Sequence, residues 1–419
     1  MGPDHPAHAA VARVARESCR RLIALLASRS GGIAQAEDAL ADAFRSALET
    51  WPNQGIPRNP EAWLLTAARR RVIDAHRHDA VRAEAVTTLL SIADEAMDGV
   101  EEGAAFPDER LKLLFVCAHP AIDVAARTPL MLQVVLGLDA GDIASAFLVK
   151  PATMAQRLAR AKAKIRDARI SYEVPDHKAL PERLDAVLQA IYGIYGLGWD
   201  ELMGADSPRR GHAAEAVELG RLLHLQMPDQ AEVKGLLALM LHCEARRPAR
   251  RNASGEFVPL DEQDTSLWLH PLIAEADELL AQASLLNTLG RFQLEAAIQS
   301  VHARRSAGYA TDWQSIALLY DGLASRAPAL GTWVARASAW SKVQGPDFAL
   351  QLLAQLPTEA VEGYQPYWVL LSTLMQRLGR LKEASTALER AIGLCVDPAT
   401  RQYLLQQAMF ISVSMRGHA

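Results

Sequence analysis

The sequence has few of the features that mark membrane, secreted or metal-binding proteins. Only four of its 419 residues are cysteines, and these lie far apart without a Cys-x-x-Cys pair: Cys19, Cys117, Cys243 and Cys395. This spacing argues against a cysteine-based metal site and favours a reducing compartment. No apolar run is long enough to cross a bilayer, and the N-terminal residues MGPDHPAHAA lack the apolar core of a signal peptide. We therefore expect a cytoplasmic protein with no membrane partner.

Strand-forming patterns are also scarce. Aromatic residues make up 6% of the chain, alanine and leucine dominate, and long alternating runs of β-branched residues are rare. This composition predicts an all-α fold. A chain of this length has room for two to four domains, and its 50% hydrophobic content is enough to bury sizeable cores.

The chain has little net charge, but its charges are unevenly placed. Residues 1–170 carry 22 Lys and Arg against 21 Asp and Glu, whereas the remainder carries 22 against 28. Seven basic residues and one acid lie between Lys150 and Arg169, and seven acids without a base lie between Asp94 and Glu109. A basic segment after an acidic connector suits a protein that touches nucleic acid with only part of its surface.

The pattern of helices and breakers divides the chain into five segments. Hydrophobic periodicity predicts helices over Ala9–Ser28, Ile33–Leu48 and Pro60–Arg77, with irregular backbone over Thr50–Pro60 and a hinge over Glu173–Leu184. We place the segments at 7–90, 91–107 (an acidic flexible linker), 108–172, 173–285 (helical) and 286–419 (helical and repeat-like).

Residues Leu138–Arg169 predict a short helix, a turn and a longer basic helix. Asp139 can cap the first helix, and Pro151 suits the first position of the second. We expect the inward faces to consist of Ile143, Ala146 and Phe147 in the first helix and Met154, Leu158, Ala161 and Ile165 in the second. A packed pair of this kind that presents a basic helix has the geometry of a helix that enters the DNA major groove.

Upstream, an acidic helix is followed by a loop and an arginine-rich helix. The acidic residues could simply form a solvated face near a helix N-terminus, where the helix dipole stabilises carboxylates. The three consecutive arginines Arg69–Arg71 indicate phosphate contacts, because a face that needs only solubility usually mixes charge signs.

The C-terminal part has repeat character. Trp368, Leu371, Gly379, Ala384 and Leu388 fall at tetratricopeptide-like offsets, as does Ala391. A generic array of helical hairpins explains the same pattern equally well. We find no set of nucleophile, base and orienting residue and no dinucleotide fingerprint, so we expect no enzymatic activity, no cofactor and no metal.

These features together resemble the extracytoplasmic-function (ECF) group of bacterial sigma-70 factors. The first segment resembles their region 2 in AEDALADAF and PEAWLLTAARRRVIDAHR, and the third resembles region 4 in DERLKLLFVCAHPAI and LDAGDIASAFLVKPATMAQRLARAKAKIR. The second half resembles the C-terminal extension of one ECF group with tetratricopeptide-like repeats, in LHCEARRPAR, SGEFVPLDEQDTSLW, GRFQLEAAIQSVHA and DWQSIALLYDGLA.

The resemblance implies a role for individual residues. Binding to RNA polymerase core, through the clamp helices of its largest subunit, would fall to Glu37, Asp38, Asp42 and Phe44. Contacts to the −10 promoter element would fall to Asn53, Gln54, Arg58 and Asn59 around an extruded base, and to Arg70, Arg71, Asp74 and Arg77 on the next helix. Contacts to the −35 element, beside the β-subunit flap, would fall to Thr153, Gln156, Arg157, Arg160 and Lys164.

Several alternatives stay open. For Arg157, helix packing or a phosphate contact is as plausible as a base contact, and Ala155 stands where the family often has a basic residue. The helical extension is expected to modulate activity by docking on the sigma segments or by binding a protein partner. Two competing functions are a free-standing helix-turn-helix regulator with a sensing domain and a repeat scaffold with a vestigial N-terminal part.

Overall fold

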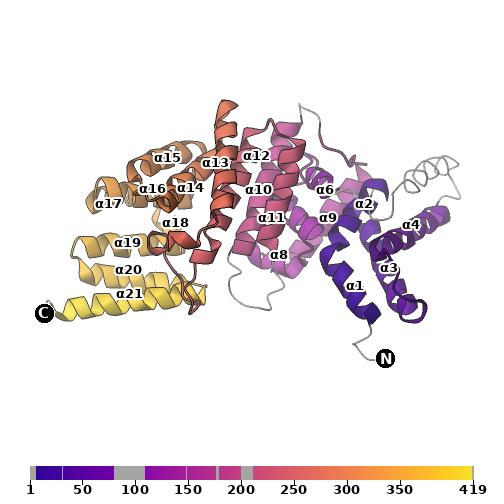
Figure 1. Ribbon diagram of the computed structural model, residues 1–419, viewed down its shortest axis with the longest axis horizontal. Helices are drawn as coiled ribbons and strands as arrows, with labels where there is room; N and C mark the ends of the chain where they lie inside the picture. The colour runs from indigo at the N-terminus through magenta and orange to yellow at the C-terminus, as the bar shows by residue number, and fades with distance from the viewer. Residues whose placement is uncertain are drawn as a thin grey trace. The chain divides into compact units, whose positions relative to one another are not determined.

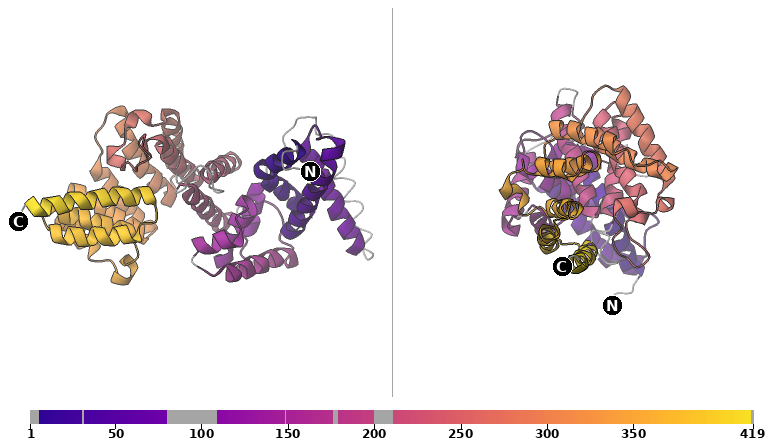
Figure 2. Two further views of the ribbon diagram at one scale, coloured as in Figure 1. Left: turned by 90° about the horizontal axis from the view of Figure 1, so that it is seen from below. Right: turned by 90° about the vertical axis from the view of Figure 1, so that its left-hand side faces the viewer.

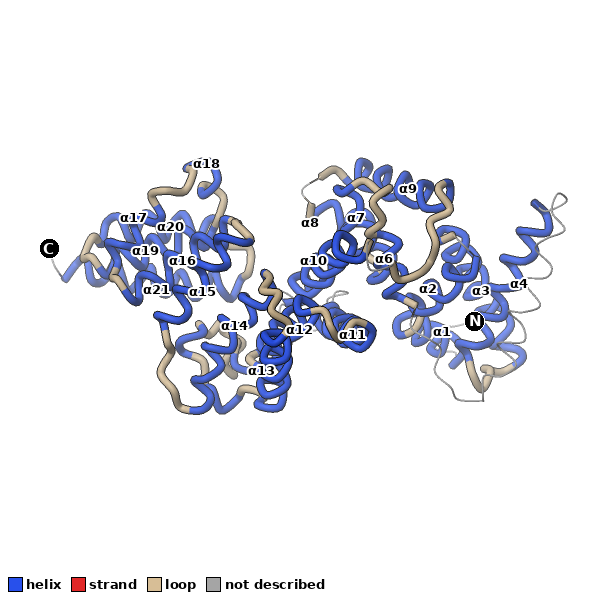
Figure 3. The backbone as a smooth tube through the Cα atoms, turned by 90° about the horizontal axis from the view of Figure 1, so that it is seen from above, coloured by secondary structure: helices blue, strands red, loops and turns tan. Residues whose placement is uncertain are grey.

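A computed structural model describes residues 6–30, 32–79, 109–147, 149–175, 179–199 and 211–417. The all-α prediction is confirmed: within these ranges the only strand-like pairing is an isolated antiparallel bridge between Arg251 and Phe257 (Figure 3). None of the helices described in them is both long and apolar enough to pass through a bilayer. The chain forms two compact units, Met1–Ile194 and Tyr195–Ala419. The acidic linker predicted at 91–107 lies outside the described residues.

In the residues that the structure describes, the first unit consists of helices (Figure 1), and the segment η1 is a short π-helix. They are α1 (Pro6–Glu17), α2 (Cys19–Ser30), α3 (Ile33–Gln54), α4 (Pro60–Asp79), α6 (Arg110–Cys117), α7 (Val124–Met131), η1 (Leu132–Leu136), α8 (Ala140–Ala146), α9 (Pro151–Asp167) and α10 (Leu180–Trp199). The boundary between the two units falls inside α10. The hinge predicted over Glu173–Leu184 is therefore wrong in its last part, because α10 begins at Leu180.

Helices α1 to α4 pack on one another around small and aliphatic residues. The helix predicted over Ala9–Ser28 is two helices, α1 and α2, which meet at the buried Ser18. The hydroxyl of Ser18 donates a short hydrogen bond to Glu61 at the start of α4. In α3, Ala36, Leu40, Ala43 and Ala47 recur at helical spacing and are buried in the core.

Helices α6 to α9 form a second packed group. The predicted inner face of α9 is confirmed, since Met154, Leu158, Ala161 and Ile165 are all buried. The prediction for Phe147 is wrong: α8 ends at Ala146, so Phe147 lies beyond the helix and its side chain is 38% exposed.

Arg127 attaches α7 to its surroundings, because its buried guanidinium donates to the carbonyls of Ile122 (3.1 Å) and Pro120 (3.4 Å). The same side chain lies 3.6 Å from Glu182 of α10. Helix α10 is therefore joined to the second packed group by an ion pair as well as by the chain.

The second unit is a series of helices joined by short turns and one long polar loop (Figure 2). Its α-helices are α11 (His212–Gln226), α12 (Ala231–Ala245), α13 (His270–Leu285), α14 (Arg291–Ala303), α15 (Trp313–Arg326), α16 (Leu330–Val343), α17 (Pro346–Leu353), α18 (Thr358–Val361), α19 (Gln365–Arg377), α20 (Leu381–Leu394) and α21 (Pro398–Gly417). Short 3-10 turns lie at η2 (Arg247–Ala249), η3 (Leu260–Glu262), η4 (Thr265–Leu267) and η5 (Arg304–Ala307).

Helix α12 is the centre of the first half of this unit and packs on both α13 and α14. The carboxylate of Glu232, in its first turn, accepts hydrogen bonds from the backbone amides of Phe292 (2.9 Å) and Gln293 (3.1 Å) at the start of α14. A carboxylate there satisfies free amides and interacts favourably with the helix dipole. The close approach requires glycine, since a Cβ at Gly235 would lie 2.6 Å from the backbone nitrogen of Gln293, and one at Gly290 would overlap the Glu232 carboxylate.

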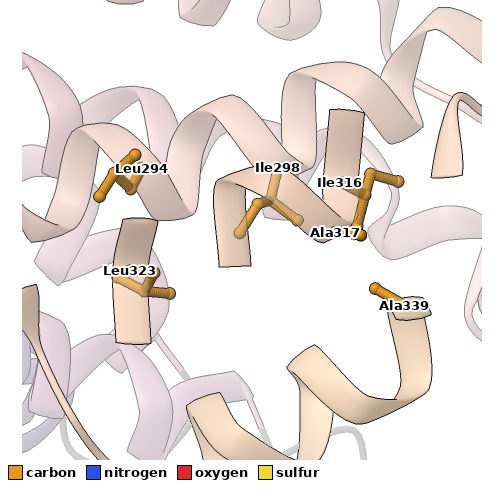
Figure 4. Packing of buried hydrophobic residues seen from close by; sticks show 6 residues of the cluster. All are labelled: Leu294, Ile298, Ile316, Ala317, Leu323 and Ala339. Atoms are coloured by element: carbon orange, nitrogen blue, oxygen red, sulfur yellow. The ribbon is translucent and has the colours of Figure 1, made fainter. Parts of the chain in front are cut away.

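Helices α14, α15 and α16 share the next core. Leu294, Ile298, Ile316 and Leu323 meet there with two alanines that let the helices approach closely (Figure 4). The imidazole of His302, at the end of α14, packs edge-on against Trp313 with 5.5 Å between ring centroids. Burial lowers the pKa of His302 to about 4, with the nearby positive charge of Arg246 acting in the same direction.

Helices α19, α20 and α21 lie side by side and share a core (Figures 1 and 2). Gly379, with a φ of +72°, makes the turn between α19 and α20. The hydroxyl of Ser372 donates to the carbonyl of Ala384 across the pair, at 2.8 Å. This hairpin has the glycine turn and the small contact residues that the repeat pattern predicted; assignment to the tetratricopeptide class stays a prediction.

Candidate nucleic-acid interface

The five residues predicted to contact the −35 element share one surface groove of about 500 Å³ in the first unit. One wall is the basic face of α9, and the other is the segment just before α7, with Ile122 and Asp123, together with Ala126 in its first turn. Figure 3 shows α7 and α9 next to one another, and the two helices are in contact. The α9 residues that line the groove are Thr153, Gln156, Arg157, Arg160 and Lys164. All of these except the half-buried Arg157 are exposed.

Local sequence explains how α9 is presented. Asp139 caps α8 as predicted, because its carboxylate accepts from the amides of Gly141 (2.7 Å) and Asp142 (2.8 Å). Pro151 begins α9 after an extended Lys150. The proline N–H is not needed at this position, because the first amides of a helix have no partner within the helix. The N-terminal turn of α9, which carries Thr153, therefore begins at a proline, and the aspartate cap belongs to the preceding helix α8.

Arg157 has a structural contact in this groove. Its Nη1 atom donates to the carbonyl of Ala125, at 3.3 Å. The backbone there is held in turn by Asp123, whose carboxylate accepts from the amide of Ala125 at 2.8 Å. The packing role that the sequence left open for Arg157 is thus present, and Asp123 adds a negative charge to the groove wall that the sequence did not indicate.

The residues predicted to bind polymerase lie on α3, and two of them are paired with cations. Asp42 lies 2.5 Å from Arg45 and 3.6 Å from Arg71 of α4, so one predicted polymerase contact faces one predicted −10 contact. Glu37 pairs with Lys162 of α9 at 2.7 Å. Asp38 is exposed. Phe44, in contrast, is half-buried.

The loop predicted over Thr50–Pro60 is helical in its first half, which corrects the placement of Asn53 and Gln54. Helix α3 runs to Gln54 through Pro52, and Gly55, with a φ of +88°, ends it. The helix continues because Trp51 is buried, 2% exposed, with its ring edge-on to Trp63 at 5.5 Å between centroids. Burial of the large Trp51 side chain and its contact with Trp63 stabilise this last turn, in which Pro52 removes one backbone hydrogen bond.

Two of the four residues predicted around an extruded base bond to nearby backbone. Asn53 donates to the backbone carbonyl of Glu49 at 3.3 Å, and the side-chain Oδ1 of Asn59 caps α4 by accepting from the amide of Ala62 at 3.1 Å. Gln54 and Arg58 are exposed. The structure thus keeps these four residues within one short segment but splits them between a helix end and a turn.

The arginine-rich helix α4 presents Arg70 and Arg71 at the surface. Asp74 and Arg77 lie on the same helix, whose backbone is described to Asp79, but their side chains lie outside the described set. The first unit therefore carries two groups of exposed cations, one on α4 and one on α9.

Comparison with known proteins relates two segments of the chain to protein families. Residues 15–81 match the sigma-70 region 2 family, which supports membership of the sigma-70 family and implies contact with RNA polymerase core and promoter DNA. Residues 183–284 match a family of unknown function, DUF6596. No solved structure matches the chain.

A relative over almost the full length is also known. An uncharacterized protein of Rhizobium meliloti is 38% identical over 376 residues, which cover 89% of each chain. The chain belongs to the same protein family as this relative, and it carries a sigma-70 region 2 domain at its N-terminal end.

Proposed function

We propose that the protein is a sigma factor of the ECF type, which binds RNA polymerase core and directs it to promoters. Helices α3 and α4 would bind core and the −10 element, and α9 would enter the major groove of the −35 element. The helical second unit would modulate this activity, either by docking on the first unit or by binding a protein partner. No catalytic residue, metal or cofactor is required for this function.

The observation that carries the proposal is the groove along α9. A sigma-70 region 2 domain is followed in the same chain by a helix whose exposed polar and basic residues, 11 positions apart from Thr153 to Lys164, share one surface. Bidentate and hydrogen-bonding side chains on one helix face are what direct readout of base edges requires. The exposed arginines of α4 supply phosphate contacts for a second DNA segment.

In vitro transcription with purified core polymerase tests the proposal. We expect the full-length protein to start transcription at specific promoters, and Arg70→Ala and Gln156→Ala to lower it by about tenfold each, since a good base or phosphate contact contributes on the order of 1–3 kcal/mol. Arg166→Ala is the matched control, because Arg166 lies on α9 outside the groove and is 70% exposed. Failure of the protein to bind core would refute the proposal, and tight sequence-specific DNA binding without core would favour a free-standing regulator.

Removal of the second unit tests its regulatory role. The stop codon belongs after Trp199, because α10 extends to this residue and its Glu182 pairs with Arg127. We expect the shortened protein to differ from full length in transcription. Equal transcription by both forms under all conditions tried would contradict a modulating role.

A further inference from the structure

One ion pair joins the helix proposed to bind polymerase to the helix proposed to bind the −35 element. Lys162 Nζ of α9 lies 2.7 Å from a carboxylate oxygen of Glu37 on α3, across 125 residues of sequence. The two side chains are only 17% and 27% exposed. Salt and water screen a pair at this depth less than they screen a fully exposed pair.

Lys162 projects from the side of α9 that faces away from the groove. At about 100° per residue, Lys162 lies roughly 200° around the helix from Arg160, which lines the groove. Helix α9 therefore presents one face to the candidate DNA surface and another to α3. The contact with α3 does not itself cover the residues proposed to bind the −35 element.

Other contacts run along the same boundary, which we call the seam. Helix α2 packs against α6 and η1. The guanidinium of Arg20 covers Gly137, where an added Cβ would lie 1.7 Å from its nitrogen. The partly buried Tyr172, just after α9, lies beside the Cys117 thiol and the backbone of Ile33. The seam thus holds the α1–α4 group against the α6–α9 group.

This packed arrangement is incompatible with simultaneous contact to both promoter elements. The elements lie about two helical turns apart, which is roughly 70 Å of B-DNA. Helix α4 packs on α3, and the ion pair holds α9 on α3 as well. If α4 is on the −10 element, α9 must leave α3 before it can reach the −35 element.

We propose that the Glu37–Lys162 ion pair stabilises a closed form of the protein that competes with polymerase for Glu37. This inference rests on the proposed function and adds its regulation. In the closed form Glu37 is neutralised within the chain, and on polymerase it would exchange Lys162 for a cation of the partner. The apparent dissociation constant for core then equals that of the open form divided by the open fraction.

The two partners of the pair should have opposite effects on core binding. Lys162→Met keeps the aliphatic stem and removes the charge, so it should open the seam and tighten core binding by up to about fivefold, the upper range of one partly exposed ion pair. Glu37→Gln should open the seam equally but weaken core binding, because the residue itself is the proposed contact. Lys162→Arg keeps the pair and should behave as wild type.

The measurements use the full-length protein. Fluorescence titration with purified core gives the affinity, and hydrogen exchange of the peptides around Tyr172 and α6 reports opening of the seam. Arg166→Met controls for loss of a positive charge on α9, because Arg166 pairs only with its neighbour Asp167 (2.9 Å) among its described ion pairs. Circular dichroism establishes that each variant is folded.

Each outcome decides the matter. Faster exchange at the seam in both variants, with tighter core binding only in Lys162→Met, supports the proposal. Unchanged exchange in both variants, or weaker core binding by Lys162→Met than by Arg166→Met, overturns it. If the wild-type protein does not bind core at all, the proposed function is wrong. If the wild-type protein binds core and Lys162→Met binds it equally, the proposed function stands and the inference about the ion pair is wrong.

Discussion

The two units contain runs of arginine that look alike in sequence and differ in their surroundings. In the second unit, the run Arg246–Arg251 is engaged inside the fold: Arg246 donates to Gln299 at 2.5 Å, Arg247 to Glu244 at 2.8 Å, and Arg251 lies 3.4 Å from Asp397. In the first-unit run Arg69–Arg71, Arg70 and Arg71 are exposed, although Arg71 also lies 3.6 Å from Asp42. A run of positive charge thus indicates a nucleic-acid surface only where the fold leaves its side chains available.

Burial differs in the same way. Helix α12 buries twelve of its residues, including the charged Lys234 and the imidazole of His242. Helix α9 buries only four, all apolar. We expect substitutions in the second unit to act mainly on stability and those on α4 and α9 to act mainly on DNA binding. Substitutions in both units test this contrast.

Gly235→Ala should destabilise the second unit by about 1–3 kcal/mol, because the added methyl group would meet the rigid backbone nitrogen of Gln293 at 2.6 Å. Gly393→Ala is the control, since nothing lies within 4 Å of the position that an added Cβ would take at this helical glycine, and the change should be neutral or slightly stabilising. Denaturant unfolding followed by circular dichroism measures both. Equal stability of the two variants would contradict the close packing of α12 and α14.

The second unit should lose stability in acid through His302. Its pKa is lowered to about 4 in the folded protein, against an ordinary value of 6.5, so the unfolded chain binds more protons between these values. Stability contributed by neutral His302 is complete above pH 6.5 and is lost as the pH falls towards 4, up to about 3 kcal/mol. His302→Phe should reduce the pH dependence of the unfolding free energy over this interval. An unchanged slope of unfolding free energy against pH would exclude His302 as the cause of the acid destabilisation.

Two arginine substitutions, one in each unit, should have different effects on stability and on promoter binding. Arg246→Ala should lower the unfolding free energy by about 1–2 kcal/mol, since it removes a hydrogen bond to Gln299, and should leave promoter binding by the polymerase complex unchanged. Arg70→Ala should leave the unfolding free energy unchanged and weaken promoter binding by the polymerase complex. Thermal unfolding and the salt dependence of promoter binding measure the two effects, and the slope of log affinity on log salt should fall by about 0.9 for one lost duplex phosphate contact. If both variants changed stability and promoter binding in the same way, the proposed difference between the two arginine runs would be wrong.

Helix caps should contribute equally in the two units. Asp139 caps α8, and Asp312 caps α15 by accepting from the amide of Ser315 at 3.0 Å. Alanine at either position should cost about 1 kcal/mol, while asparagine should retain most of the stability. Chemical unfolding of the four variants checks this, and a cost confined to one unit would show that the cap in the other is redundant.

Local features of the fold were predictable from the sequence because their causes are local. The cap at Asp139, the start of α9 at Pro151 and the buried stripe from Met154 to Ile165 follow from chemistry within a few residues, and all are present. The end of α3 was not predictable, because the burial of Trp51 depends on Trp63 in the next helix.

The candidate site was predictable on one side only. The α9 residues were identified from the resemblance to the ECF group, whereas the opposite wall, with Ile122 and Asp123, adjoins them only after α7 has packed on α9. The Glu37–Lys162 pair likewise joins residues 125 positions apart, and neither residue has a local signal of its partner.

The cap that Glu232 provides to α14 has a consequence for how the protein is made. The carboxylate is in the first turn of α12, 60 residues before the amide that it caps, so it leaves the ribosome before α14 does. Helix α14 completes these terminal hydrogen bonds only when it packs against α12. A circular permutant that begins between α12 and α14 would place Glu232 much farther along the chain from the amides that it caps, and should therefore refold more slowly than the natural order.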